Sequence, residues 1–470
     1  MVSNNAVDAF SETFTGKVYR PGDAGYENSR QVWNADINRY PALVASCSTT
    51  ADIAAAIAFG RAEELEISVR GGGHNFAGLA VAEGGLMIHL EGVNSVHVDP
   101  VTRRAYVGGG CQLKQLDVAL AEHGLGVTAG IVSHTGVGGL TLGGGVGFLL
   151  RRFGLACDNL VEAEVVLSDG TVVRASATEN ADLFWALRGG GGNFGIVTEF
   201  VFQLHPIGET ANVGMFFFPP DRGPDVLRFF RDLPSRLPDD MAILVFGMDA
   251  PDAPFVPDEY KHTAGYFIQL VTVGPWAELA AAADLVRSEL SPVFEMVEPM
   301  RYLDLQGMND AFNPWGVHGY EKAVYLPGID DGAIDVMQRH LPGKRGAFSY
   351  FAAMTLGGAY ARVADEDAAW GGPRDAAYHF IITATCETAE ELADDRKWVR
   401  QFWTDMRPFG MSSGSYINNM NEYDEDRVRA AYGPEKYDRL SRIKARYDPE
   451  NVFHHNQNIK PARIVGAGSS

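Results

Sequence analysis

The residues best suited to chemistry lie in a glycine-rich turn that ends at His74. Arg70 and the three glycines 71–73 precede this histidine, and Asn75 follows it. Glycines let a ligand approach the main chain closely, and successive free N–H groups in such a turn form a hollow that suits a phosphate. Arg70 would add positive charge, and His74 would present a nitrogen nucleophile to the ligand. An ordinary surface turn is the alternative, because a single glycine-rich loop is a weak signal.

Two more glycine-rich segments follow, at residues 135–148 and 188–197. The first contains seven glycines interspersed with Val, Leu and Phe, whereas flexible linkers are rich in Gly and Ser. Three such segments indicate an extended ligand that the main chain surrounds, such as a dinucleotide with its pyrophosphate. None combines the G-x-G-x-x-G spacing with a strand-to-helix turn and a downstream acid, which argues against a doubly wound NAD-binding fold.

The pattern of apolar residues predicts the elements that position these segments. In the first 205 residues short strands alternate with amphipathic helices, and each glycine-rich segment lies beside a predicted strand. After His205 and Pro206, aromatic-rich strands alternate with helices, which is typical of an α+β arrangement with an antiparallel sheet. We expect a cofactor-binding part at 1–205, a substrate-binding part at 206–410 and a C-terminal segment at 411–470 that returns to the first part.

Composition narrows the classes of function. Lys and Arg number 39 against 60 Asp and Glu, so the formal net charge is -21. An acidic surface repels nucleic acids and anionic membranes, and the sequence shows neither a secretion signal nor the run of about 18 apolar residues that spans a membrane. The four cysteines are widely spaced without a metal-binding pattern, as expected of buried thiols in a reducing compartment. We expect a cytoplasmic protein that binds no nucleic acid, membrane or metal.

Four motifs resemble those of the berberine bridge enzyme-like oxidases, in particular their bacterial members, in the vanillyl-alcohol oxidase superfamily of FAD enzymes. The likeness extends from Val32 to Ile459. It implies an α+β fold in which an FAD-binding domain of two subdomains carries an inserted antiparallel-sheet substrate domain. The motifs are Arg70-Gly-Gly-Gly-His74-Asn75, residues 135–148, residues 189–197 and the closing Tyr447-Asp-Pro-Glu-Asn-Val-Phe with Asn456-Gln-Asn-Ile.

The resemblance implies that His74 bonds covalently to the 8α-methyl carbon of FAD. Many members attach the flavin a second time, through the cysteine of a Cys-Pro-Thr sequence. This chain has Ser133-His134-Thr135 at that place, so we expect a single covalent link. The absence of the second link favours a small amine, alcohol or natural product over a carbohydrate as the substrate.

The resemblance also implies which residues contact the ligands. Tyr416 begins a Tyr-x-Asn motif that lines the pocket in the family, and we expect it to be a pocket wall or the catalytic base, with a packed core tyrosine as the alternative. Tyr350, Met354 and His379 are candidates for the substrate pocket, although ordinary sheet packing also explains them. The expected cofactor contacts are Arg70, Gly71, Gly72, Gly73, His74, Asn75, Gly78, Thr135, Gly138, Gly139, Gly143, Gly144, Gly147, Gly195, Ile196, Val197, Asn418 and Asn456.

Together these observations predict an FAD-dependent oxidase. It would take a hydride from a C–H bond next to an alcohol or amine of a small organic substrate and reduce O₂ to H₂O₂. Three alternatives remain open at this stage: a flavin dehydrogenase with another acceptor, an oxygenase or cyclase of a biosynthetic pathway, and a flavin-binding protein without turnover. The sequence does not identify the substrate.

Overall fold

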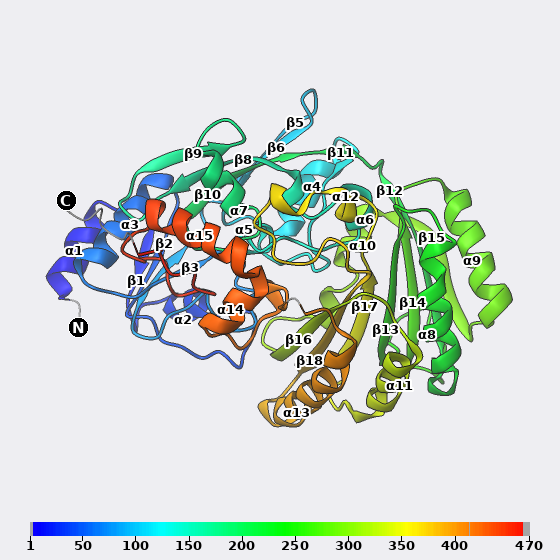
Figure 1. Ribbon diagram of the computed structural model, residues 1–470. Helices are drawn as coiled ribbons and strands as arrows, with labels where there is room; N and C mark the ends of the chain where they lie inside the picture. Colours follow the sequence, from blue (N-terminus) through cyan, green and yellow to red (C-terminus); the bar gives the residue numbers. More distant parts are fainter. Residues whose placement is uncertain (1–2, 413, 464–470) are drawn as a thin grey trace, which may run out of the picture.

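Three large β-sheets organise the chain in the computed structural model, which describes residues 3–412 and 414–463 (Figure 1). Within this part of the chain the sheets have four, five and seven strands, and β7 (Leu125–Gly126) and β11 (His205–Pro206) form a small extra ribbon. The two smaller sheets come from residues 17–203 and the seven-stranded sheet from residues 210–386. This is the α+β arrangement that the sequence predicts.

The four-stranded sheet carries the first glycine-rich turn at its edge. Two of its strands run parallel to the strand between them, and α3 (Thr50–Ala62) connects them and packs apolar side chains on the sheet. Thr49 caps α3, because its side chain accepts the N–H of Asp52 and the Asp52 carboxylate accepts the N–H of Thr49. The turn at 71–73 starts where the edge strand β3 ends. In spatial order the strands are β1 (Lys17–Tyr19), β2 (Leu43–Ser46), β4 (Leu86–His89) and β3 (Ile67–Arg70).

The five-stranded antiparallel sheet positions the other two glycine-rich segments. The second segment contains the short helix α5 (Val137–Leu142), and the third leads from α7 (Ala181–Leu187) into the central strand β10. Helices α4 (Leu113–Ala121) and α6 (Leu150–Phe153) flank the second segment in sequence. In spatial order the strands are β5 (Val96–Asp99), β6 (Arg104–Gly108), β10 (Ile196–Gln203), β8 (Leu160–Val166) and β9 (Val172–Ser176).

The seven-stranded antiparallel sheet has one face covered by helices. The helices α8 (Gly223–Asp232), α9 (Trp276–Leu290), α11 (Asp331–His340) and α13 (Ala389–Met406) share one apolar core with this face. The other face of this sheet is turned towards the glycine-rich segments. In spatial order the strands are β15 (Phe294–Arg301), β12 (Thr210–Phe218), β14 (Ala264–Thr272), β13 (Ala242–Asp249), β17 (Tyr350–Thr355), β18 (Tyr378–Cys386) and β16 (His318–Leu326).

The last segment packs against the two smaller sheets. Helix α15 (Pro434–Tyr447) lies on α7 (Figure 1), and α15 ends in a buried ion pair in which the Lys444 ammonium donates to Asp448 at 2.6 Å. Lys444 also donates to the carbonyl of Asn193 at 2.6 Å, which ties the tail to the third glycine-rich segment. No described helix is both long and apolar enough to cross a membrane. The remaining helices are α1 (Asn4–Glu12), α2 (Tyr26–Arg30), α10 (Tyr302–Gly307), α12 (Ala359–Arg362) and α14 (Glu425–Tyr432).

Candidate active site

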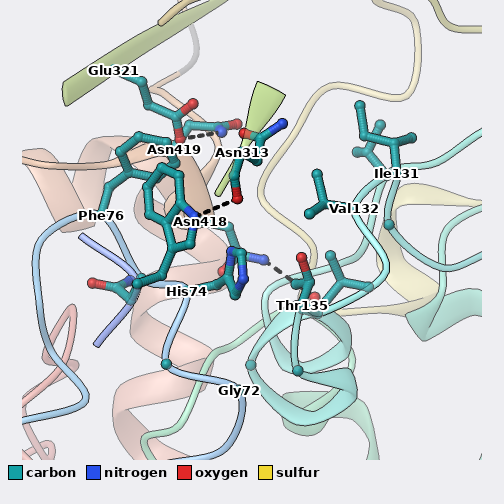
Figure 2. Close-up of a pocket in the computed structure, with 18 of the residues that line it drawn as sticks. Gly72, His74, Phe76, Ile131, Val132, Thr135, Asn313, Glu321, Asn418 and Asn419 are labelled. Atoms are coloured by element: carbon teal, nitrogen blue, oxygen red, sulfur yellow. Dashed lines mark hydrogen bonds between the residues drawn. The ribbon is translucent and has the colours of Figure 1, made fainter. Parts of the chain in front are cut away.

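A cavity of about 580 Å³ lies between the glycine-rich segments and the open face of the seven-stranded sheet (Figure 2). Its volume is within the range of small-molecule and cofactor sites, about 300–1,000 Å³. All three glycine-rich segments contribute to one half of the wall, and strands β12, β13, β14, β16, β17 and β18 contribute side chains to the other half. A ligand in this cavity therefore contacts both parts of the chain.

The glycine-rich half of the cavity depends on close backbone contacts. Gly72 and Gly136 pack back to back, so that a Cβ on either residue would overlap the backbone nitrogen of the other. Gly73 has a φ of +73°, which residues with a Cβ rarely adopt. No Lys or Arg is present among the described residues that line the cavity. On this side a phosphate would therefore bind backbone N–H groups.

His74 ends the first turn and is paired with His134. Nε2 of His74 and Nδ1 of His134 are 2.6 Å apart, and the ring of Trp33 stacks on His74 with a centroid distance of 5.3 Å. Burial, together with the neighbouring His134, lowers the pKa of His74 to about 3. His74 is therefore neutral at physiological pH. Because His134 engages Nε2, Nδ1 is the ring nitrogen that remains for a ligand.

Tyr416 and Asn418 lie where the C-terminal segment crosses the cavity, at the 3₁₀ turn η8 (Ile417–Asn419). The hydroxyl oxygen of Tyr416 accepts the N–H of Gly145 at 3.0 Å and an Nδ2–H of Asn418 at 2.8 Å. Burial raises the pKa of Tyr416 well above its ordinary value of 10.0. Tyr416 is thus a neutral phenol that fixes the amide of Asn418.

The sheet half of the cavity contains a buried carboxyl group, that of Glu321 on β16. Asn419 donates an Nδ2–H to its Oε1 at 2.6 Å, and Thr383 donates its O–H to Oε2 at 3.4 Å. Figure 2 shows the hydrogen bond between Glu321 and Asn419 at one side of the cavity. Burial raises the pKa of Glu321 to about 7. A carboxyl group that titrates near neutral pH is suited to proton transfer.

Comparison with known proteins identifies the family. Residues 41–176 match the family described as FAD binding domain, and residues 415–460 match the family described as berberine and berberine like. Over 458 residues the chain is 30% identical to the (R)-6-hydroxynicotine oxidase of Paenarthrobacter nicotinovorans, an alignment that covers 95% of this chain and 97% of that protein. The chain belongs to the berberine bridge enzyme-like family of FAD-linked oxidases.

Solved structures share the fold of this oxidase. The 6-hydroxy-D-nicotine oxidase of Arthrobacter nicotinovorans matches it with a TM-score of 0.85 at 26% identity, over 96% of this chain and 99% of the other. The berberine bridge enzyme-like protein 1 of Physcomitrella patens matches with a TM-score of 0.87 at 23% identity, over 97% of this chain and 99% of the other. These matches confirm the predicted FAD-binding domain with its inserted antiparallel-sheet domain.

The described residues of the cavity fit FAD. The glycine-rich half offers backbone without side chains, as close contact with a pyrophosphate requires. Three polar atoms of the wall are buried without a hydrogen-bond partner in the described chain, namely Nε2 of His379, Oδ1 of Asn419 and Oδ1 of Asn456. Asn419 acts on His379 as a hydrogen-bond acceptor that raises its pKa. Because buried polar groups are normally paired, Oδ1 of Asn456 is therefore the atom that is available to a cofactor.

Most of the predicted site residues lie in the wall of this cavity. On the sheet side these include all three candidates for the substrate pocket, which come from two neighbouring strands. The predicted residues in the wall are Gly71, Gly72, Gly73, His74, Asn75, Thr135, Gly138, Gly139, Gly195, Ile196, Val197, Asn418, Asn456, Tyr416, Tyr350, Met354 and His379.

Five predicted cofactor contacts are not in the wall, because other parts of the chain occupy the space beside them. A Cβ at Gly143 would overlap the side chain of Asn418, so this glycine serves packing. Three other glycines are enclosed in the same way by side chains or backbone. The guanidinium of Arg70 donates to the carbonyl of Ser29 at 2.7 Å. The five are Arg70, Gly78, Gly143, Gly144 and Gly147.

Sequence reasoning missed Glu321 and Asn419. Glu321 lies on β16, a strand that the sequence analysis did not predict. A signal was present, because residues 319–325 read Gly-Tyr-Glu-Lys-Ala-Val-Tyr and place two charges inside an otherwise apolar segment. A charge at such a position is normally paired or functional. Asn419 directly follows the predicted Tyr-x-Asn motif.

Proposed function

We propose that this oxidase holds FAD covalently through His74 and oxidises a small organic molecule at a C–H bond next to an amine or alcohol, with dioxygen as the acceptor. The observation that carries the proposal is the single cavity that His74 and Glu321 both line. FAD bound there would supply the redox chemistry, namely hydride acceptance and the reduction of O₂ to H₂O₂ with two electrons and two protons. The chain supplies binding, orientation and proton transfer.

His74 has the properties of an attachment residue. Its imidazole is neutral and therefore nucleophilic, and His134 fixes its orientation through Nε2. Ser133, at the position of the second link in related proteins, is engaged elsewhere: its hydroxyl donates to Oδ2 of Asp310 at 2.5 Å and its N–H to Oδ1 at 2.8 Å. We therefore propose one covalent link.

Glu321 is the proposed acceptor of the substrate's proton. A pKa of about 7 lets the carboxylate form at working pH and still accept a proton. Asn419 holds the carboxylate in place at 2.6 Å. The sequence left Tyr416 as wall or base. Burial raises its pKa although the two N–H donors to its oxygen lower it, and this raised pKa favours the wall. Glu321 is then the residue that moves the proton, and Tyr416 positions Asn418.

Acid precipitation tests the covalent link. The pellet of the wild-type protein should stay yellow, whereas His74→Ala should release its flavin into the supernatant. His454→Ala is the matched control, because His454 is exposed and does not line the cavity, and its pellet should stay yellow. A colourless wild-type pellet would overturn the covalent link.

Peroxide formation tests the acceptor. Oxygen consumption and H₂O₂ should appear together when amines and alcohols of different size are supplied. A flavin that a donor bleaches but that air reoxidises only slowly would identify a dehydrogenase instead. A flavin that no donor bleaches would contradict enzymatic function.

A further inference from the structure

We propose that His134 accepts the proton that His74 gives up on bonding to FAD, and that Asp310 of the inserted domain stabilises the positive charge that His134 then carries. The inference rests on the proposed function, because it concerns the covalent link at His74. It assigns the attachment reaction to residues of both domains, so attachment requires that the domains are docked. Three features support it: the hydrogens on the two rings, the charge beside His134 and the contacts between the domains.

Hydrogen bonds determine which nitrogen of His134 is a donor. Nδ1 of His134 faces Nε2 of His74 at 2.6 Å. Burial lowers the pKa of His134, whereas a hydrogen bond with the backbone of Asn313 raises it. A backbone hydrogen bond favours the protonated ring only when a carbonyl group accepts the N–H. Since His74 occupies Nδ1, Nε2 of His134 is the nitrogen that donates to Asn313.

This arrangement fixes the hydrogens on both rings. A neutral imidazole carries one N–H, and both rings are neutral near pH 7 because burial lowers the pKa of each. The hydrogen of His134 is on Nε2, so its Nδ1 is an acceptor, and Nε2 of His74 carries the hydrogen that lies between the rings. Nδ1 of His74 is therefore without a hydrogen, and its lone pair is free to bond with the cofactor.

Attachment of FAD to His74 releases two hydrogens. The lone pair of Nδ1 forms the bond to the 8α carbon, and one C–H bond of the methyl group breaks. With a substituent on each nitrogen, the imidazole of His74 is a cation, and it gives its Nε2–H to Nδ1 of His134. The two electrons of the broken C–H bond remain on the flavin until O₂ removes them. The net reaction converts FAD, His74 and O₂ into the linked cofactor and one H₂O₂, whose hydrogens come from the methyl group and from His74.

Asp310 provides a negative charge beside His134. Its carboxylate is held by the residue that precedes this histidine, because Ser133 donates its N–H to Oδ1 at 2.8 Å and its hydroxyl to Oδ2 at 2.5 Å. Burial lowers the pKa of His134, and the Asp310 carboxylate opposes this effect. Protonated His134 is therefore a cation with a fixed counter-charge, and such a pair costs less free energy than an isolated buried charge.

The segment that carries Asp310 belongs to the inserted domain, whereas both histidines belong to the FAD-binding domain. Asp310 begins the 3₁₀ turn η4 (Asp310–Phe312). Directly after this turn, the carbonyl of Asn313 accepts the indole N–H of Trp33 at 2.9 Å, and the ring of Trp33 stacks on His74. One short segment of the inserted domain thus supplies the acceptor for Nε2–H of the second histidine and its counter-charge. Only docked domains complete this attachment site.

The time course of flavin attachment in the full-length apoprotein tests the inference. FAD is added in air at saturating concentration, samples are precipitated with acid, and the absorbance of the pellet measures the linked flavin. His134→Gln offers an oxygen to the N–H of His74 but cannot take up its proton. Attachment in this variant should be about 10²- to 10⁴-fold slower than in the wild type, as expected for the loss of a general base.

A second variant isolates the charge of the inserted domain. Asp310→Asn keeps an acceptor for Ser133 and removes the negative charge, so attachment should be about tenfold slower, which corresponds to one pKa unit. Asp304→Asn is the matched control, because Asp304 is an exposed carboxylate of the same domain that pairs with Arg301 at 2.7 Å. This control should attach FAD at the wild-type rate.

Added imidazole separates proton transfer from positioning. A small base that enters the space left in His134→Ala can take the proton, so imidazole should accelerate attachment in this variant and not in the wild type. Equal effects of imidazole on both proteins, or a His134→Gln variant that attaches FAD as fast as the wild type, would overturn the role of His134. A wild-type rate in Asp310→Asn would overturn the role of the inserted domain.

The same time course separates the inference from the proposed function. A wild-type pellet that stays colourless would overturn the covalent link and the inference with it. Linked flavin in the wild type, together with unchanged rates in the His134→Gln and Asp310→Asn variants, would overturn the inference alone and leave the covalent link in place.

Discussion

Replacement of Asp117 by Asn should stabilise the protein above pH 7. Asp117 lies on α4 and is buried against Gln306 on α10, where the inserted domain meets the FAD-binding domain. Gln306 donates an Nε2–H to Oδ2 of Asp117 at 3.1 Å, but Oε1 of Gln306 has no described partner. Burial raises the pKa of Asp117 from its ordinary value of 3.8 to about 7. The charged carboxylate is therefore unfavourable in this place.

The size of the effect follows from this pKa. The unfolded chain releases the proton near pH 4 and the folded chain near pH 7, so the free energy of unfolding falls as the pH rises between these values. A difference of one pKa unit corresponds to about 1.4 kcal/mol. The free energy of unfolding of the wild type is therefore about 4 kcal/mol lower above pH 7 than it is below pH 4. The side-chain amide of the Asp117→Asn variant resembles the protonated acid and can donate to Oε1 of Gln306. The variant loses none of this stability.

Thermal unfolding between pH 4.5 and 8.5 measures the difference. A chain of 470 residues has an unfolding entropy of about 1 kcal/mol/K, so about 4 kcal/mol corresponds to a rise of about 4 °C in the midpoint. The midpoints of the two proteins should converge at pH 4.5 and separate towards pH 8. Glu321, whose pKa is also raised, is present in both proteins and cancels in the comparison.

Two controls make the result interpretable. Flavin content must be equal in both proteins, because a ligand that binds the folded state raises the midpoint by itself. Glu122→Gln removes an exposed carboxylate next to the end of the same helix and should leave the midpoint unchanged. A difference between Asp117→Asn and the wild type that does not grow with pH, or a less stable variant at pH 8, would refute the reasoning.

Three further predictions concern the site. Glu321→Gln should slow flavin reduction by about 10²- to 10⁴-fold. The wild-type rate should rise with pH through about 7 as the carboxylate forms, and stopped-flow rates of the variant should lack this rise; a variant with the wild-type profile would exclude Glu321 as the base. His134→Ala should slow formation of acid-stable flavin about tenfold or more, because it frees the ring of His74; an unchanged time course after FAD is added to apoprotein would contradict this. Gly72→Ala should abolish flavin binding, because its Cβ would push the backbone of Gly136 away. The control Gly328→Ala has open space beside its Cα and should retain the flavin. Flavin absorbance at equal protein concentration measures the difference.

Most of the residues that the sequence singles out line one cavity, because the relevant signals are local. His74 and its three preceding glycines are consecutive, and a ligand-binding turn of this kind needs those residue types in that order. Many strands and helices of the inserted domain were also predictable from their aromatic and apolar periodicity. The strand β16 was missed because its two charges interrupt the apolar pattern. The same interruption marks the residue that the structure adds to the site.

The glycines show where local reasoning stops. Gly72 and Gly143 both belong to glycine-rich segments, and the sequence treats them alike. In the structure Gly72 lines the cavity, whereas Gly143 is closed off by the side chain of Asn418. Whether a glycine faces a ligand or another part of the chain depends on a segment that is remote in sequence. No local pattern contains that information.

The sequence by itself determined the cofactor class, the candidate attachment residue and the order of the parts, since each depends on residue types within a short segment. The tertiary structure decided that Glu321 is buried in the cavity wall, where we propose that it accepts the proton. Glu321 acquires a pKa near 7 because the assembled fold buries it, and the hydrogen bonds from Thr383 and Asn419, 62 and 98 positions away, only partly offset this effect. Burial is a property of the assembled fold, and it sets the energy of a charge. The charge state of Glu321 in the sheet half of the cavity therefore depends on how the strands pack.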